Sequence, residues 1–498
     1  MGIETEYGIS VPGHPHINAM LASSQVVNAY ADLVGIATGA RARWDYDEET
    51  PLRDARGFDL SRADADPSQL TDADPGMANL VLTNGARLYV DHAHPEYSSP
   101  EVLTPFDAAL YDRAGEVIMQ QAADAVAQMP GAQPIRVYKN NTDNKGASYG
   151  THENYLMQRT TPFASIVAGL LPFFATRQIL VGAGRVGIGQ DGKGDGFQLS
   201  QRADFFEVEV GLETTLKRPI VNTRDEPHAD PQFHRRLHVI VGDANLSEVA
   251  TYLKMAITSL TLSLIEDDVD LSDLALQNPV QAIHEISHDP TLSLKVELAD
   301  GRKLTAREIQ REFAERAAAH VSRGTTPPDG PTQMAVRDWL QFLDKLDEDP
   351  QLCMGELDWV TKLNILNGYR RRDGFDWSHP QLQLVDIQYS DMDTQRGLAR
   401  RLETNGNLAR MTTPEQVRHA IEHPPEATRA WFRGECLRRY AKNVAAASWD
   451  SVVFDVPSRP SLQRVPTLDP MRGTRSAVQG LLDRCPTAED LLRELAGQ

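Results

Sequence analysis

The segments Ile3-Glu4-Thr5-Glu6-Tyr7-Gly8-Ile9 and Arg87-Leu88-Tyr89-Val90-Asp91 decide how this chain is built. In an extended strand alternate side chains share a face, so Glu4 and Glu6 project together, about 6.6–7 Å apart along the backbone. The second segment alternates in the same way, with its charged and phenolic side chains on one face and two aliphatic residues on the other. Polar groups repeated on one face of a strand indicate either a solvated sheet face or a binding site.

The rest of the chain mixes helical and extended patterns. Apolar residues recur at three- and four-residue steps, which predicts helices, over residues 17–36, 107–128, 246–265, 304–322 and 333–347. Further strands are predicted at residues 135–138, 205–210 and 238–241. Because strands and helices do not follow a strict βαβ order, the sequence predicts an α+β fold with a largely antiparallel sheet.

Composition excludes several classes of protein. The 498 residues are 41% hydrophobic and 24% charged, which is ordinary globular usage. The net charge of −20 argues against nonspecific binding to nucleic acid. Three cysteines are too few for a disulfide framework, and no apolar window approaches the ~18 residues of a membrane span. We therefore expect a cytoplasmic protein that binds neither nucleic acid nor membrane.

Residues 44–75 form an acidic stretch that differs from the rest of the chain. It holds ten Asp and Glu residues against three arginines and few large apolar groups. Such a composition can bury little surface, which favours a solvated connection. Long insertions in compact domains are also often functional, so a lid or gating loop is the second interpretation.

The strand at 87–91 and its continuation indicate a metal and phosphate site. A predicted turn at 92–99 follows the strand and adds Glu96. A cation, a phenol and two carboxylates within about ten residues suit Mg²⁺, which prefers oxygen ligands, together with a phosphate. His92 and His94 could indicate zinc, but this pair alone is a weak signal, so a hard cation is favoured.

Two further segments have polar or glycine-rich character. Residues 139–155 are a polar loop, with His152 near its end, that leads into a probable strand. Residues 182–187 match GxGxxG, but the glycine-rich sequence that follows cannot form the helix that a dinucleotide site requires. A loop that exposes backbone N–H groups is favoured there. Paired arginines at 235–236 and 400–401 indicate either solvated faces or a groove for an acidic polypeptide.

Four motifs resemble one known family. They are Gly2-Ile3-Glu4-Thr5-Glu6-Tyr7-Gly8, the run from Asn84 to Asp91 with His94-Pro95-Glu96-Tyr97, Thr151-His152-Glu153-Asn154-Tyr155, and the run from Thr428 to Gly434. They closely resemble the family of Pup ligases and Pup deamidases/depupylases. The resemblance implies a glutamine-synthetase-like fold, with an antiparallel sheet forming a concave cradle packed by helices. It also implies a catalytic domain over 1–425 and a small C-terminal domain over 426–498.

The resemblance implies a role for individual residues. Asp91 matches the catalytic aspartate. Glu4, Tyr89 and Glu96 match metal ligands, with Glu6 and His152 expected in the same shell. Arg87, Ser99 and Trp449 match positions that contact ATP (or ADP). Arg433, Arg202 and Arg224 are further expected contacts to phosphate or a substrate carboxylate. Mg²⁺ and the nucleotide are the implied cofactors, Pup and pupylated proteins the implied partners, and the bacterial proteasome the implied pathway.

Two activities divide the family, and spacing separates them. Glu4 and Asp91 lie 87 positions apart here, mainly because of the acidic stretch, which the ligases lack. We therefore expect deamidation of the C-terminal Gln of Pup and hydrolysis of the Pup–lysine isopeptide bond. The alternatives are an ATP-dependent Pup ligase and a metal-dependent amidohydrolase that uses no nucleotide. Whether Asp91, water or nucleotide-derived phosphate is the nucleophile stays open.

Overall fold

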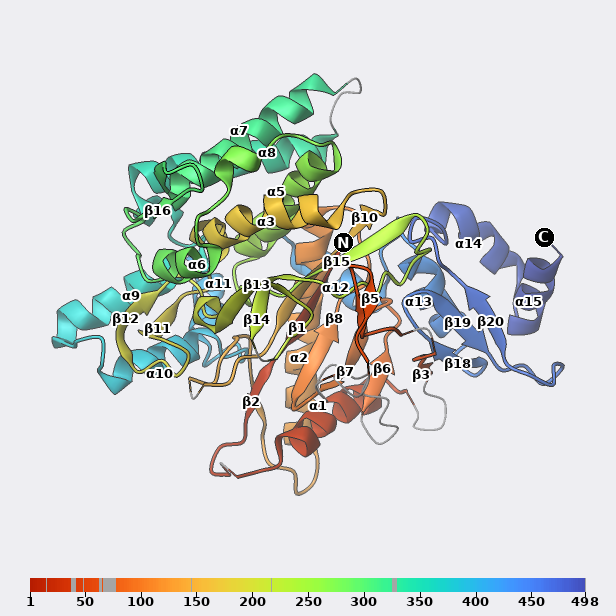
Figure 1. The fold of residues 1–498 in the computed structure, drawn as a ribbon. Coiled ribbons are helices and arrows are strands. Elements are labelled where there is room, and N and C mark those ends of the chain that lie inside the picture. The colour runs from red at the N-terminus through yellow and green to blue at the C-terminus, as the bar shows by residue number, and fades with distance from the viewer. Residues whose placement is uncertain are drawn as a thin grey trace.

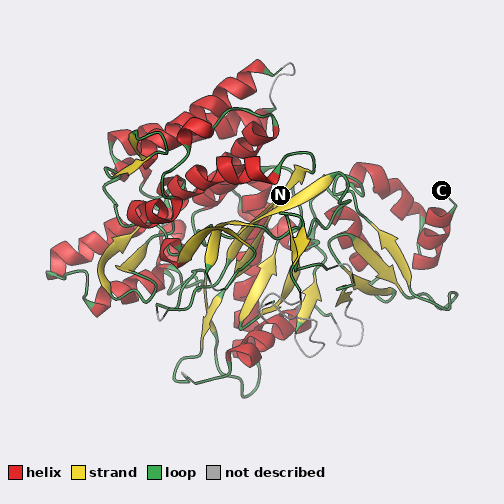
Figure 2. Cartoon of the chain, in the orientation of Figure 1, coloured by secondary structure: helices red, strands yellow, loops and turns green. Residues whose placement is uncertain are grey.

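A computed structural model describes residues 1–14, 16–36, 42–47, 49–61, 65, 78–144, 146–215, 217–324 and 329–497. Figure 1 shows a central sheet with helices packed on it, a helical region on one side, and the last part of the chain on the other. Figure 2 shows the same mixture of helices and strands by type. The α+β class expected from the sequence is confirmed.

The central sheet has six strands in the order β15-β10-β1-β8-β7-β6. Every neighbouring pair is antiparallel. The strands are β1 (Gly2–Glu6), β6 (Asn79–Val81), β7 (Arg87–Asp91), β8 (His94–Ser98), β10 (Thr151–Gln158) and β15 (His234–Val239). The N-terminal strand β1 therefore lies between two strands that come from distant parts of the sequence.

Helices cover one face of this sheet. The helices that pack there are α1 (Ala19–Leu33), α2 (Pro105–Gln128) and α5 (Glu248–Glu266), and α3 (Phe163–Thr176) packs on α5. The covered face carries buried Ile3, Leu88, Tyr97, Tyr155 and Leu237, one from each of five strands. Burial of these side chains supplies the hydrophobic free energy that holds the sheet against the helices. The other face carries the polar residues of the same strands.

Helix α2 approaches the sheet closely because it has a glycine at the contact. A Cβ added to Gly115 would lie 2.2 Å from the Tyr97 ring. The helix begins with Thr104 as N-cap, whose side chain accepts a hydrogen bond from the Asp107 N–H. The predicted helix at 107–128 thus starts two residues earlier than expected.

The remaining elements extend the sheet region and form a peripheral helical layer. The helices are α4 (Gln178–Val181), α6 (Pro279–Ser287), α7 (Ala306–Arg323), α8 (Gly330–Glu348), α9 (Asp358–Asp373), α10 (Pro380–Tyr389), α11 (Leu398–Thr404) and α12 (Pro414–Glu422). The strands are β2 (Gly8–Ser10), β9 (Arg136–Tyr138), β11 (Arg185–Ile188), β12 (Gly194–Gln198), β13 (Phe206–Gly211), β14 (Arg218–Asn222), β16 (Lys295–Glu297) and β17 (Lys303–Thr305).

The C-terminal part has its own core and a four-stranded sheet of order β20-β19-β18-β3. Its elements are α13 (Ala430–Arg439), β18 (Val444–Ala447), β19 (Ser451–Phe454), β20 (Gln463–Pro466), α14 (Arg475–Arg484) and α15 (Ala488–Ala496). The edge strand β3 (Arg43–Trp44) comes from the start of the acidic stretch and pairs in parallel with β18. Asp45, next to it, accepts hydrogen bonds from Ser451 and Arg464.

The described part of the acidic stretch is packed against the protein. Strands β4 (Arg53–Asp54) and β5 (Phe58–Asp59) form a small hairpin. Ala55 N–H donates to the Thr223 carbonyl at 2.8 Å, and the Thr223 hydroxyl donates to Asp54 at 2.6 Å. Residues 48, 62–64 and 66–75 of this stretch lie outside the described residues.

Three local predictions differ from the structure. The strand predicted at 3–9 is divided at Tyr7, because β2 leaves the central sheet and pairs with β9. The turn predicted at 92–99 is only two residues long, and β8 follows it. The strand predicted at 238–241 begins earlier, since β15 runs from His234 to Val239. In agreement with its exclusion from dinucleotide binding, the glycine-rich 182–187 segment leads into the β11–β12 hairpin.

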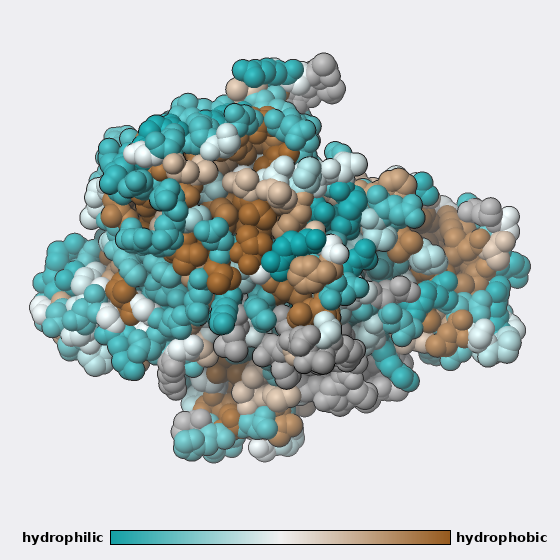
Figure 3. Space-filling model, in the orientation of Figure 1, coloured by the Kyte–Doolittle hydropathy of each residue, from teal (hydrophilic) through white to brown (hydrophobic). Residues whose placement is uncertain are grey.

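The surface is largely polar. In Figure 3 one face is mostly hydrophilic, with apolar groups in several separate patches. Within the described ranges, no helix combines the length and apolar character needed to cross a membrane.

Candidate functional site

Three carboxylates converge on the open face of the central sheet. Glu6 on β1 lies opposite Glu96 on β8, and Glu96 lies opposite Tyr89 on β7. Asp91 ends β7, and one oxygen from each of Glu6, Asp91 and Glu96 lies within 4.8 Å of the others. This is the oxygen-rich donor set that the two sequence segments predicted, and it is chemically suited to a hard divalent cation.

A second group of donors adjoins the first. Glu4 lies opposite His152, and His152 Nδ1 is 3.5 Å from Glu4 Oε2. Donor atoms of Glu4, His152 and His238 lie within 4.8 Å of one another. Strand β1 contributes one carboxylate to each group, Glu4 to one and Glu6 to the other, and the two groups lie side by side because both residues point to the same face. The site therefore offers a carboxylate-only set beside a mixed histidine–carboxylate set.

The charges of the carboxylates are not balanced within the first group. Burial, and then the neighbouring carboxylates of Asp91 and Glu6, raise the pKa of Glu96 well above its ordinary value. Burial also raises the pKa of Tyr89, and Glu96 adds to this effect. A divalent cation among these oxygens would reverse both effects by favouring the ionised forms. The residues present thus fit a metal ion.

Glu6 is held in a single orientation by groups on both of its oxygens. Gly150 N–H donates to Oε1 at 2.7 Å, and His94 Nδ1 lies 3.3 Å from Oε2. Burial opposes ionisation, but His94 and His152 together with the Gly150 hydrogen bond lower the pKa of Glu6 to about 2.

Glu4 is oriented in a comparable way by β10 and β15. Asn154 Nδ2 donates to Glu4 Oε1 at 3.0 Å, and Arg236 donates to Asn154 Oδ1 at 2.7 Å. Burial opposes ionisation of Glu4, but His152, His238 and Arg236 lower its pKa below the ordinary value. Both carboxylates are therefore ionised at neutral pH and available as ligands.

A cavity of about 250 Å³ opens beside Glu4. Ser99 and Trp449, two predicted nucleotide contacts, both line it, as do the apolar side chains of Leu103, Leu262 and Met471. The Ser99 hydroxyl accepts a hydrogen bond from the Ile3 N–H at 2.9 Å. A cavity with an apolar lining and a charged end suits a ligand with a flat ring and an anionic tail.

Arg87 is packed among aromatic rings at the edge of the site. Its guanidinium carbon lies 3.7 Å from the centroid of the Tyr89 ring and 4.1 Å from that of Trp44. Its Nε donates to Asn79 Oδ1 at 3.1 Å. Stacking of this kind orients the guanidinium and retains its charge.

Arg433 lies behind the cavity rather than in it. Its five N–H donors bond to the Gly85 carbonyl, the Glu101 carboxylate and the Trp449 carbonyl. Its guanidinium carbon is 5.0 Å from the Trp449 ring centroid. In this structure Arg433 supports Trp449 and has no donor left for a ligand.

The two other predicted arginines lie at different edges of the site. Arg202 is buried, donates to the Ile240 carbonyl and lies within electrostatic reach of Glu6. Burial, and then the neighbouring Arg218, lower the pKa of the Arg202 guanidinium to about 9. Arg224 has a buried Nε without a hydrogen-bond partner, on the side of Glu226 and His238. Arg202 with Arg218 forms a paired cationic edge that could receive an anionic group.

Several residues at the site were not predicted. His238, Asn154, Arg236 and Arg218 all reach the site, but no role was assigned to His238, Asn154 or Arg218. Alternation alone would have placed Asn154 on the face of His152. The paired arginines expected to line a groove behave differently, because Arg235 and Arg400 are buried. Arg400 pairs with Glu116 and Glu403, so it fits neither of the two interpretations, a solvated face or a surface groove.

Comparisons with known proteins show which family this sequence resembles. The model of the Pup-ligase protein family matches residues 1–453. A depupylase of Acidothermus cellulolyticus is 60% identical over 498 residues, covering 100% of this chain and 99% of the relative. A Pup deamidase/depupylase of Mycolicibacterium smegmatis is 56% identical over 496 residues, covering 99% of each. A Pup–protein ligase of Acidimicrobium ferrooxidans is 43% identical, covering 72% of this chain and 80% of the ligase.

Two solved structures share the fold. The ligase PafA in its complex with Pup has a TM-score of 0.79 and 31% identity, covering 97% of this chain and 90% of the ligase chain. PafA in complex with ADP has a TM-score of 0.73 and 34% identity, covering 84% and 91%.

Proposed function

Since the chain belongs to the Pup-ligase protein family, we propose that it hydrolyses amide bonds at the C-terminal residue of Pup. The two reactions are deamidation of a C-terminal Gln to Glu and cleavage of the isopeptide bond that joins Pup to a lysine. The observation that carries this proposal is similarity along the whole chain: curated deamidases/depupylases match at 55–60% identity over at least 99% of its length. The ligase from Acidimicrobium matches at 43% over 72%.

The cavity beside Glu4 is the proposed nucleotide site. Ser99 and Trp449 line it, and a ligase of similar fold binds ADP. The apolar lining would hold the base, while Arg236, which lines the cavity 3.8 Å from Glu4, would face the anionic tail. Arg87, expected to contact the nucleotide, is not among the residues that line this cavity. Arg433 would act by holding Trp449 in place.

The proposed metal is Mg²⁺, held by Glu4, Glu6, Tyr89, Glu96 and His152 as expected from the sequence. The structure brings their strands together on one face, and His238 joins them as a further donor. When bound, Mg²⁺ and the nucleotide would supply positive potential where negative charge develops on the substrate carbonyl oxygen.

Asp91 is the proposed catalytic residue. It ends β7 at the edge of the carboxylate group, with 28% of its side chain exposed, so a substrate carbonyl can approach it. Its carboxylate either attacks the carbonyl carbon or removes a proton from attacking water. Direct attack would expel the nitrogen as ammonia or the lysine amine and leave Pup joined to Asp91 as an anhydride, which water then hydrolyses to free both carboxylates. Attack by water would expel the same nitrogen and leave the carboxylate on Pup directly. The Arg202–Arg218 edge would bind an anionic group of the substrate.

Mass spectrometry of a Pup peptide ending in Gln tests the proposal. With Mg²⁺ and ATP we expect a gain of one dalton, and a Pup–lysine conjugate should release free Pup. Asp91→Asn should slow both reactions by at least about 100-fold. The exposed Asp195 on β12 supplies a control, because Asp195→Asn should keep the wild-type rate.

The same samples separate the rival activities. Pup ending in Glu, mixed with ATP and a lysine peptide, should give no conjugate; efficient conjugation without deamidation would identify a ligase. Full deamidation without any nucleotide would indicate a metal-dependent amidohydrolase. Trapping Pup on Asp91 would favour direct attack by that carboxylate.

A further inference from the structure

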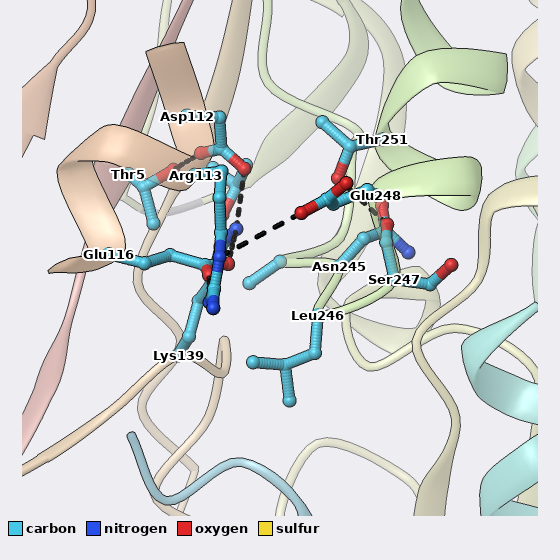
Figure 4. Close-up of polar contacts among 12 residues, drawn as sticks. Thr5, Asp112, Arg113, Glu116, Lys139, Asn245, Leu246, Ser247, Glu248 and Thr251 are labelled. Atoms are coloured by element: carbon cyan, nitrogen blue, oxygen red, sulfur yellow. Dashed lines mark hydrogen bonds and ion pairs between the residues drawn. The ribbon is translucent and has the colours of Figure 1, made fainter. Parts of the chain in front are cut away.

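The covered face of β1 carries polar side chains directly beneath the site. Thr5 lies between Glu4 and Glu6 but points the opposite way, and it is fully buried. Its hydroxyl donates to Asp112 Oδ1 on α2 at 3.3 Å. Figure 4 shows Thr5, Asp112 and Glu116 around the side chain of Lys139. An apolar residue would be the ordinary choice on this face.

Lys139 is the cation at the centre of this cluster. Its Nζ donates to Asp112 Oδ2 at 2.6 Å and to Glu116 Oε1 at 2.7 Å. Only 1% of its side chain is exposed. Arg113 and Arg400 balance the second oxygen of Glu116. The ammonium group therefore fixes the start of its own loop to helix α2, under β1.

The loop that begins at Lys139 ends on the carboxylate of Glu6. Gly150, near its end, supplies the N–H that binds Glu6 Oε1. Tyr149 stacks on His94, with ring centroids 4.3 Å apart, and His94 faces Glu6 Oε2. Tyr149 also returns to the start of the loop, because its hydroxyl donates to Asn140 Oδ1 at 2.5 Å.

We propose that Lys139 is a positioning residue for the carboxylate of Glu6. Through Asp112 and Thr5 it holds β1 from the covered face. It also anchors the loop that binds Glu6 Oε1 and stacks Tyr149 on His94, which faces Oε2. Glu6 is thereby fixed from two directions by one buried cation.

Energetics favour a positioning role over simple stabilisation. A buried ion pair loses so much hydration that replacing it with apolar groups is often neutral or stabilising. Groups that orient metal ligands can by contrast change metal affinity by 10- to 100-fold. The proposal rests on the proposed metal site, and its test must separate the two.

The test is Mn²⁺ binding, followed by calorimetry and electron paramagnetic resonance, in wild type, Glu6→Gln and the double variant Lys139→Met/Asp112→Asn. Both charges are removed together, so no unpaired charge is left between them. We expect the double variant to bind Mn²⁺ about tenfold more weakly than wild type does, because Glu6 would no longer be held in place. Lys139→Arg, which keeps the charge, should recover part of the loss.

The chain offers a matched control in a second buried Lys–Asp pair. Lys362 and Asp386 are 2.8 Å apart, with 1% and 7% of their side chains exposed, against 1% and 6% for Lys139 and Asp112. Lys362→Met/Asp386→Asn should lower the melting temperature to a similar extent while leaving Mn²⁺ affinity unchanged. Equal affinity in the two double variants would overturn the role of Lys139.

Failure of the proposed metal site and misfolding of the double variant can both be told apart from failure of the proposed role of Lys139. If wild type binds no Mn²⁺, or Glu6→Gln binds it as wild type does, the proposed metal site itself is wrong. If Lys139→Met/Asp112→Asn does not fold, Tyr149→Phe decides, since it removes only the hydroxyl that closes the loop on Asn140. We then expect a severalfold loss of Mn²⁺ affinity at nearly constant melting temperature, and unchanged affinity would contradict the proposal.

Discussion

Individual side chains at the site are fixed by partners on neighbouring strands, and His238 illustrates this. Its ring lies 4.9 Å from that of His152, and Asn154 Oδ1 lies 3.0 Å from its Nδ1. Burial, and then Arg236, lower the pKa of His238 well below its ordinary value. The imidazole is therefore neutral at physiological pH, which is the form that binds metals.

Replacing His238 should weaken metal binding without unfolding the protein. We expect His238→Asn to lower Mn²⁺ affinity by at least about tenfold, since a donor is removed from the group that contains Glu4. Calorimetric titration measures the change. His234→Asn, on the same strand but outside the group, is the control, and equal affinities in the two variants would exclude His238 as a ligand.

Residue patterns predicted the site better than they predicted its assembly. Alternation placed Glu4 with Glu6 and Arg87 with Tyr89 and Asp91, and these side chains do share one face. His238 and Arg218 could not be assigned, because they reach the site only through the pairing of distant strands. The roles of the predicted ligands and of Asp91 stay predictions, while the family, the α+β class and the depupylase resemblance are confirmed.

At the scale of elements, the sequence predicted α1, α2, α5, α7 and α8 but left the other helices unassigned, and it misjudged β8. Pro95 interrupts a strand pattern because it has no N–H to donate. Here its carbonyl accepts from the Tyr7 N–H, and His92 with φ of 51° makes the preceding turn tight. The order of the strands in the sheet could not be predicted from local sequence patterns either, because β1 pairs with β8 and β10, roughly 90 and 150 residues away.

The contact between α2 and β8 supports a prediction about packing. Gly115→Ala should destabilise the protein by about 1–3 kcal/mol, because the new methyl group would overlap the Tyr97 ring. Alanine favours a helix over glycine by only about 1 kcal/mol, which is too little to compensate. Thermal unfolding measures the difference.

A helical glycine in open space provides the comparison. Gly368 in α9 has no atom within 4 Å of an added Cβ. Gly368→Ala should therefore raise the melting temperature. A Gly115→Ala protein as stable as Gly368→Ala would show that α2 does not need its close approach.

At the scale of the whole molecule, Glu101 ties the C-terminal part to the central sheet. It follows β8 and pairs with Arg429 and Arg433. Burial alone would raise the pKa of Glu101, but Arg433 and Arg429 lower it to about 2. A carboxyl group whose pKa is lower in the folded state stabilises the fold above its ordinary pKa of 4.5 and loses that effect as the pH falls toward 2.

Glu101→Gln should accordingly flatten the pH dependence of stability. We expect the free energy of unfolding at pH 7 to fall by about 3 kcal/mol, with the difference from wild type shrinking between pH 4.5 and 2. Urea titrations across this range measure it. Glu415→Gln, in an exposed pair with Arg418, should follow the wild-type curve, and parallel curves for Glu101→Gln and wild type would contradict the role of Glu101.

The strand β3 gives the C-terminal sheet a contribution from the first tenth of the chain. Trp44 packs into the C-terminal core, and the centroid of its ring lies 5.1 Å from that of the Trp449 ring. A fragment that starts at residue 426 would lack β3 and Trp44. The backbone edge of β18 would then be unpaired and the apolar surface that Trp44 covers would be exposed, and both promote self-association. Anyone wishing to study these last residues in isolation should therefore supply residues 42–47 as a fused or added peptide.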